Sequence, residues 1–121
     1  MATANIESIL ISIKKLLGIV EEDESFDDEL VIHINSVFFT LYQLGVGPKG
    51  FSIEDETATW ETFLEDREDL QAVRSYIYLR VRLMFDPPQM GYLVESMKKQ
   101  CEEFEWRLNV QVEEKQEEEA G

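Results

Sequence analysis

The feature that most constrains the fold is a segment near residues 66–85 that is apolar nearly all round a helix. Its main stripe at helical spacing consists of Leu70, Val73, Ile77, Val81 and Met84. A helix of this kind needs cover on several sides, so it belongs at the centre of a bundle or between subunits. Asp86, Pro87 and Pro88 end the segment, because proline lacks the amide proton that a helix needs. The sequence therefore predicts an all-α fold built around this segment.

Three further segments have long apolar stripes at helical spacing, and a fourth has a short one. They cover residues 6–17, 30–44, 90–110 and, for the short one, 59–65. The helix over 30–44 is expected to be mostly buried, with Ser25 and Asp28 capping its start. Glycines and a proline predict an ordered loop over residues 45–57, pinned by Phe51 and Ile53. We expect a single bundle of four to five helices.

Length and charge limit the classes of function. The 121 residues are enough for one domain, which we assign to residues 1–112. Residues 113–121 are acidic and almost free of apolar side chains, which predicts a disordered tail. The net charge of −15 disfavours non-specific binding to nucleic acid or anionic membranes, because such binding needs clustered Lys and Arg. No apolar run approaches a membrane span, so we expect the protein in the cytoplasm of the cell that makes it.

Residues that could carry catalysis are few. His33 is the only histidine and lies inside a predicted helix, while Cys101 lies on the apolar seam of the last one, so both are predicted to be structural. A metal-dependent hydrolase is the enzyme alternative, but Glu102 and Glu103 are followed by Trp106 where its motif needs a third acid. We expect no enzyme activity, no catalytic or metal-binding residue and no cofactor.

Arginine and aromatic side chains of the last two long helices are candidates for contact with another subunit or protein. Such residues are enriched at protein interfaces, although the arginines could also pair with acids of their own chain. The last helix carries more aromatic surface than one seam needs, which indicates a second buried face. The candidates are Tyr76, Arg80, Arg82, Tyr92, Met97, Phe104, Trp106 and Arg107.

Several stretches, in this order, resemble the head-tail connector (adaptor) proteins of tailed bacteriophages, of the type found in phages and prophages of Gram-positive bacteria. The stretches are KKLLGI (14–19), INSVFFTLYQLGVGPKGFSI (34–53), ATWETF (58–63), SYIYLRVRLMFDPP (75–88) and EFEWRLNV (103–110). The resemblance covers about residues 8–112 and implies an all-α subunit without catalytic activity. It implies a ring of about twelve copies in the virion neck, seated under the portal protein around the DNA exit channel. The ring would then bind the next neck or tail-completion protein. The C-terminal helix and tail would bind the portal.

The acidic charge fits a DNA channel, because an acidic lumen repels phosphates and lets DNA slide without specific binding. The candidate channel-facing acids are Glu54, Asp55, Glu56, Glu65 and Asp66. Solvated helix starts would explain the same acids equally well. An alternative function is an acidic DNA mimic that inhibits a DNA-binding enzyme by presenting carboxylates at phosphate-like spacing.

Overall fold

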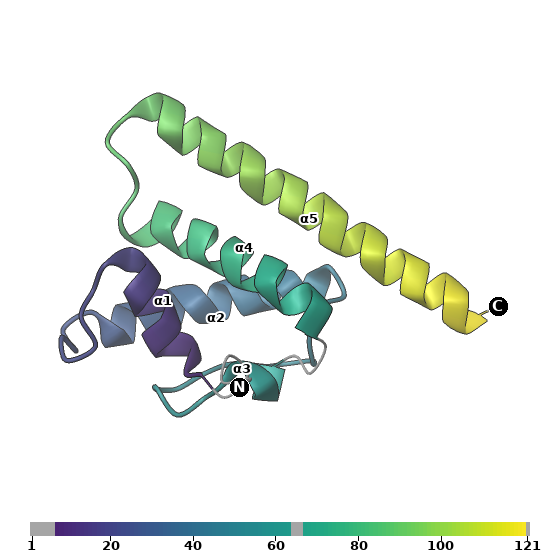
Figure 1. Cartoon of the computed structure of the whole chain (residues 1–121), viewed down its shortest axis with the longest axis horizontal. Coiled ribbons are helices and arrows are strands. Elements are labelled where there is room, and N and C mark those ends of the chain that lie inside the picture. Colours follow the sequence, from purple (N-terminus) through teal and green to yellow (C-terminus); the bar gives the residue numbers. More distant parts are fainter. Residues whose placement is uncertain (1–6, 64–66, 121) are drawn as a thin grey trace.

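A computed structural model describes residues 7–63 and 67–120, and within these ranges it contains helices and no strand. Figure 1 shows α4 lying between α5 on one side and α1 and α2 on the other. The helices are α1 (Ile9–Leu17), α2 (Asp27–Gln43), α3 (Trp60–Phe63), α4 (Arg67–Phe85) and α5 (Gly91–Ala120). The predicted all-α fold of four to five helices is confirmed.

Helix α4 occupies the centre of the bundle, as its apolar circumference predicts. It contacts α1, α2 and α5. Its side chains Val73, Ile77 and Val81 are completely buried. Burial on several sides explains why this helix, unlike α1, shows no single narrow apolar stripe.

The first helix is capped at both ends, whereas the cap predicted for the second is absent. The Ser8 hydroxyl accepts a hydrogen bond from the Ile11 amide at 3.2 Å, and Gly18 ends α1 with a left-handed φ of 82°. The predicted capping of α2 by Ser25 was wrong, because the Ser25 hydroxyl donates to the carboxylate of Asp23. Three acidic residues in the first turn of α2 interact favourably with the helix dipole in place of a side-chain cap.

The loop over residues 45–57 is ordered and pinned, as predicted. The Phe51 ring packs against Phe38 and Phe63, with centroid separations of 4.9 and 5.1 Å. Asn35 of α2 holds the buried Ile53 through two hydrogen bonds. Its side-chain amide donates to the Ile53 carbonyl at 2.9 Å, and its oxygen accepts from the Ile53 amide at 2.7 Å. The sequence pattern identified the two apolar pins but gave no sign of the asparagine.

Trp60 joins α3 to the remainder of the core. Its side chain is completely buried, and its indole N–H donates to the Ser12 hydroxyl of α1 at 2.8 Å. The guanidinium of Arg74, on α4, lies 5.3 Å from the centre of the Trp60 ring and pairs with Glu7 at 3.2 Å. One aromatic side chain therefore connects α1, α3 and α4.

Helix α5 continues to Ala120, so the predicted disordered tail from residue 113 was wrong. The residues after Val112 are mainly Glu, Gln, Lys and Ala, which are strong helix formers and extend a helix that has already begun. Val112 is half-buried and packs against Gly45, and it is the last such residue among those of α5 whose burial the structure describes. Beyond it, Figure 1 shows α5 projecting past the other helices. Neither α5 nor any other described helix is both long and apolar enough to cross a membrane.

Candidate functional site

Helix α5 is fixed to α4 through its inner face. Cys101 and Leu108 are buried there. The Tyr76 hydroxyl donates to the Glu105 carboxylate at 2.6 Å, and the Arg80 guanidinium lies 3.8 Å from the same carboxylate. Burial, followed by this hydrogen bond, raises the pKa of Tyr76, so the phenol stays protonated. Glu105 thus sets the position of α5 relative to α4.

The structure divides the predicted contact residues into inner and outer groups. Tyr76 is completely buried, so it is a core residue here and leaves the candidate contact set. Met97 and Phe104 are half-buried against the core. Arg82 donates to the hydroxyl of Tyr78 at 3.0 Å on its own helix, and this bond raises the pKa of Arg82.

Arg80 lies on α4 and faces Glu105, whereas Tyr92 and Trp106 lie on what we call the outer face of α5, defined by Tyr92, Lys99 and Trp106. These residues are spaced seven apart, so they share one side of the helix, opposite the face that contacts α4. Trp106 is 67% exposed and Tyr92 is 69% exposed. Arg107 follows Trp106 directly in the sequence and pairs with Glu103 at 2.5 Å. An exposed pair of large aromatics with adjacent arginine is typical of a protein contact surface.

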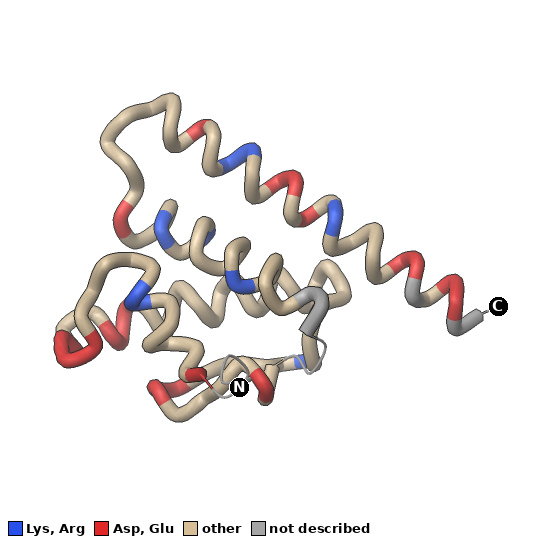
Figure 2. Tube along the Cα trace, in the orientation of Figure 1, with Lys and Arg blue, Asp and Glu red and all other residues tan. Residues whose placement is uncertain are grey.

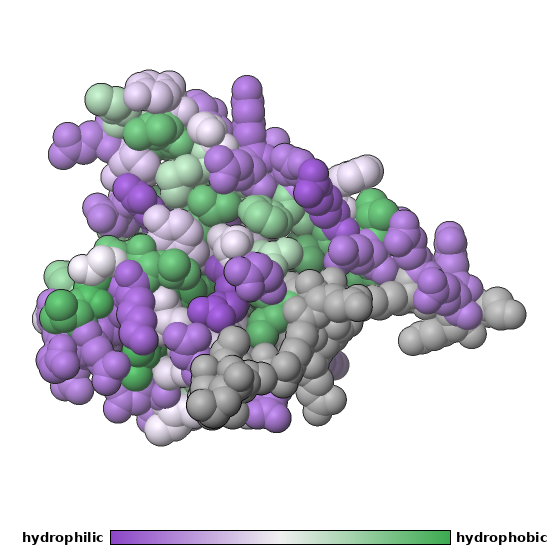
Figure 3. Space-filling view, in the orientation of Figure 1, coloured by the Kyte–Doolittle hydropathy of each residue, from purple (hydrophilic) through white to green (hydrophobic). Residues whose placement is uncertain are grey.

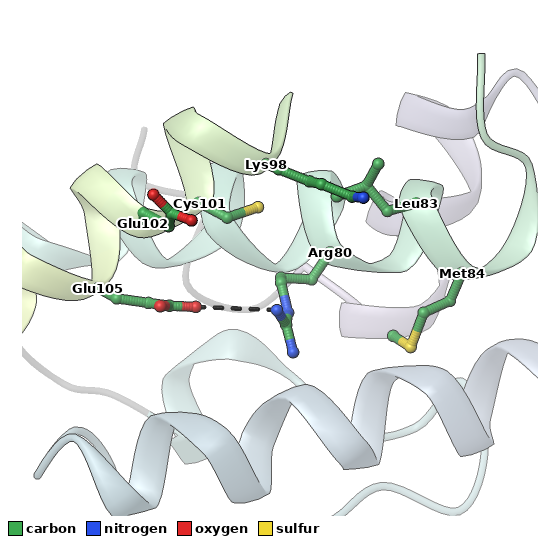
Figure 4. A pocket seen from close by; sticks show the side chains of 7 residues that line it. All are labelled: Arg80, Leu83, Met84, Lys98, Cys101, Glu102 and Glu105. Atoms are coloured by element: carbon green, nitrogen blue, oxygen red, sulfur yellow. Dashed lines mark ion pairs between the residues drawn. The ribbon is translucent and has the colours of Figure 1, made fainter. Parts of the chain in front are cut away.

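A pocket of about 440 Å³ opens between α4 and α5 (Figure 4). It is lined by Arg80, Leu83, Met84, Lys98, Cys101, Glu102 and Glu105. Burial raises the pKa of the Cys101 thiol, which disfavours the reactive thiolate. His33 lies on α2, with its ring 3.2 Å from Glu29. No group of His, Cys, Asp and Glu suited to a metal ion occurs among the residues that the structure describes.

Two acidic segments that are distant in sequence meet around a hollow of about 300 Å³, which we call the acidic hollow. Its charged lining consists of Glu24, Asp27, Asp28, Glu54, Asp55 and Glu56. Figure 2 shows these acids at the end of the molecule that carries the α1–α2 connection and the 54–56 loop. The hydroxyl and amide of Thr57 both donate to Asp55 and lower its pKa. The candidates Glu65 and Asp66 lie outside the described residues.

Helix α2 carries an exposed stripe that the sequence reasoning missed. Ile32, Ser36, Phe39 and Gln43 follow each other at helical spacing and form the outer stripe of α2. Ile32 is 68% exposed and Phe39 is 63% exposed, so the prediction of a mostly buried helix holds for one face only. The available signal was the absence of charged residues, because Leu30 to Pro48 contains no Asp, Glu, Lys or Arg.

Comparison with known proteins gives one match. A family model described as phage connector protein matches residues 9–115, which agrees with the resemblance seen in the sequence. No curated protein and no solved structure matches the chain significantly. A match over nearly the whole chain shows the family and its general role as a structural component of phage particles. This helical, acidic chain therefore belongs to the phage connector protein family.

Proposed function

We propose that the chain is a head-tail connector subunit that forms a ring under the portal, with the outer face of α5 against the portal. Trp106 is the observation that carries this proposal. It is a large aromatic side chain that the fold leaves two-thirds exposed, on a helix whose opposite face is firmly packed. Such a side chain contributes most when a partner removes it from water.

The packing of α5 supports this role. Glu105 links α5 to α4, Val112 packs against the core, and the turns that follow project past the other helices as a helical rod (Figure 1). A rod that is anchored at one end presents its side chains in a fixed geometry, which lowers the entropic cost of binding. In the ring of about twelve copies, the side away from the portal would receive the next neck or tail-completion protein.

The acidic hollow supports a second part of the proposal, namely that DNA passes through the ring without specific binding. Six carboxylates around one hollow give a strong local negative potential. Hydrogen bonds from Thr57 lower the pKa of Asp55 and so favour its charged form. A channel lined by such charges repels DNA phosphates. We place the acids Glu54, Asp55 and Glu56 on the channel side of the ring in the virion neck.

The acidic hollow also favours a second candidate function, an acidic DNA mimic that inhibits a DNA-binding enzyme. Clustered carboxylates can replace phosphates on a basic protein surface. This candidate predicts tight, salt-sensitive binding to a basic enzyme. It gives no role to Trp106, and for that reason we rank it second.

Sedimentation with the portal ring encoded by the same genome tests the connector function. We expect saturable binding of about one copy per portal subunit, as ring symmetry requires. Trp106→Ala should weaken binding at least about tenfold, as expected for a central aromatic contact. Leu16→Ala is the matched control, because it shortens an exposed apolar side chain on α1. Removal of residues 113–121 tests the projecting end of α5.

Absence of binding to isolated portals and to DNA-filled heads would overturn the connector proposal. Equal weakening by the Trp106 and Leu16 variants would overturn the assignment of the outer face of α5. Salt-sensitive capture of a basic DNA-handling enzyme, without portal binding, would support the DNA mimic instead.

A further inference from the structure

The outer stripe of α2 is an apolar surface to which nothing above assigns a function. It lies opposite the core-facing residues of the same helix, and it exposes two large apolar side chains, Ile32 and Phe39, beside the uncharged Ser36 and Gln43. The exposed Met84 of α4 widens it, since its sulfur lies 4.0 Å from the Ser36 hydroxyl. Two helices thus contribute to one patch, with Ile32 and Phe39 at its centre. Exposed patches of this kind mark contact surfaces.

The distribution of charge indicates what covers this patch. Charged residues make up 31% of the chain, yet its longest uncharged stretch is Leu30–Pro48, with 19 residues (48 − 30 + 1). The second longest is Pro87–Val94, with 8 residues (94 − 87 + 1). This second stretch is the turn into α5 and its first residues, where Met90 is 55% exposed. Figure 3 shows hydrophobic side chains gathered at the beginning of α5.

Contacts between copies of this chain must avoid its acids. Each copy carries a net charge of −15, so two copies repel each other wherever carboxylates face carboxylates. The two longest uncharged stretches both reach the surface, and both expose large apolar side chains there. They are different surfaces on different elements, so pairing one with the other is head-to-tail and leads to a closed ring when the rotation closes.

We propose that the outer stripe of α2 in one copy receives the Pro87–Leu93 segment of a second copy of this chain. Phe39 and Ile32 then contact Met90 and Leu93 across the subunit boundary. This inference rests on the proposed connector function and adds the contact by which neighbouring subunits join. Tyr92 of the outer face of α5 lies within this segment and belongs to the subunit contact, whereas Trp106, fourteen residues further along the helix, stays available for the portal.

Cysteine cross-linking on the portal-bound protein tests this contact. Single variants Phe39→Cys and Met90→Cys are mixed in a Cys101→Ala background, loaded on portal rings and oxidised. We expect a cross-linked dimer from the mixture and none from either variant alone, because the contact joins different surfaces. The double variant should give a ladder of oligomers. Leu16→Cys mixed with Met90→Cys is the matched control, since Leu16 is exposed on α1.

The outcomes separate this inference from the proposed function. Portal binding without a Phe39–Met90 cross-link, or equal cross-linking by the Leu16 control, would overturn the contact and leave the connector function standing. Cross-linking at high protein concentration without portal binding would support the contact and overturn the portal function.

A charge placed on the stripe gives an independent readout. Phe39→Glu should make loading onto the portal non-cooperative, because neighbouring copies no longer assist each other. The variant should stay folded by circular dichroism, since Phe39 is largely exposed. Cooperative loading equal to that of the wild type would overturn the proposal.

Discussion

The two tryptophans of the chain lie in opposite environments. Trp60 is completely buried and donates its indole N–H to Ser12, inside the region formed by α1 to α4. Trp106 stands on the outer face of α5 and is 67% exposed. Trp60 contributes to the stability of the fold, whereas Trp106 contributes little to it.

This difference divides the molecule into two regions. We call α1 to α4 with their loops the packed region, and the exposed side and projecting end of α5 the presented region. The packed region holds the aromatic cluster, the buried ion pair of Lys14 and the loop pinned by Asn35. The presented region has exposed aromatics and exposed ion pairs, on a helix that continues past the remainder of the fold. Substitutions in the first should change stability, and substitutions in the second should change assembly.

The largest expected contrast is between the tryptophans themselves. Trp60→Ala should lower the free energy of unfolding by about 3–5 kcal/mol, because it leaves a cavity and removes the indole N–H that donates to the Ser12 hydroxyl. Trp106→Ala should change it by less than about 0.5 kcal/mol, as expected for an exposed site. Urea denaturation of both variants provides the measurement. Comparable losses would contradict the division into two regions.

The next largest effect is expected at a glycine of the packed region. Gly47 has a left-handed φ of 86°, and a Cβ there would overlap the ring of Phe63. Gly47→Ala should therefore cost roughly 2–4 kcal/mol, from backbone strain and overpacking together. Gly18→Ala is the control, because it has the same strain with open space and should cost about 1–2 kcal/mol. Thermal unfolding that gives equal losses would show that Phe63 moves aside freely.

Two ion pairs, one in each region, should differ in their effect on stability in the same direction as the tryptophans, but by less. Lys14 is buried, lies 2.9 Å from the Asp27 carboxylate and donates to the Glu21 carbonyl at 3.0 Å. Lys14→Ala should cost roughly 2 kcal/mol, less than for a fully buried pair because Asp27 is 22% exposed. Arg107→Ala should cost less than about 0.5 kcal/mol, because both partners are exposed. Chemical denaturation of the two variants checks the ranking, and a larger cost for Arg107 would reverse it.

An effect smaller than that of Lys14→Ala is expected where the two regions join. Tyr76→Phe removes the bond to Glu105 and should cost about 1 kcal/mol, since water partly replaces it at this half-exposed carboxylate. The folded pKa of Tyr76 is raised, so this contribution is complete below the ordinary tyrosine pKa of about 10 and is lost as the pH rises above it. The stability difference between wild type and variant should therefore shrink above about pH 10. A difference that grows there would contradict the assignment.

The sequence predicted the helices well because apolar periodicity is a local property. It placed α1 and α4 correctly, and it identified Phe51 and Ile53 as the pins of the loop. It missed the Asn35 clamp, because that contact joins residues 18 positions apart and leaves no periodic trace.

The errors in the prediction have physical causes. Periodicity shows how many faces of a helix are apolar, but not how many are covered, so α2 was expected to be mostly buried, whereas Phe39 on its outer side is exposed. Composition indicated that residues after Val112 cannot bury themselves, but it overlooked that good helix formers extend an existing helix. Tyr76 was grouped with the contact residues because one sequence cannot separate the inner and outer sides of neighbouring helices.

Hydroxyl-radical footprinting of the protein, free and bound to portal rings, tests the central claim most directly. Trp106 should be oxidised in the free protein and protected in the complex, while the buried Trp60 should be unreactive in both and serves as the internal control. The acids Glu54 to Glu56 should keep their reactivity. Protection of Trp106 would establish the outer face of α5 as the portal contact, whereas continued oxidation of Trp106 in a saturated complex would contradict it.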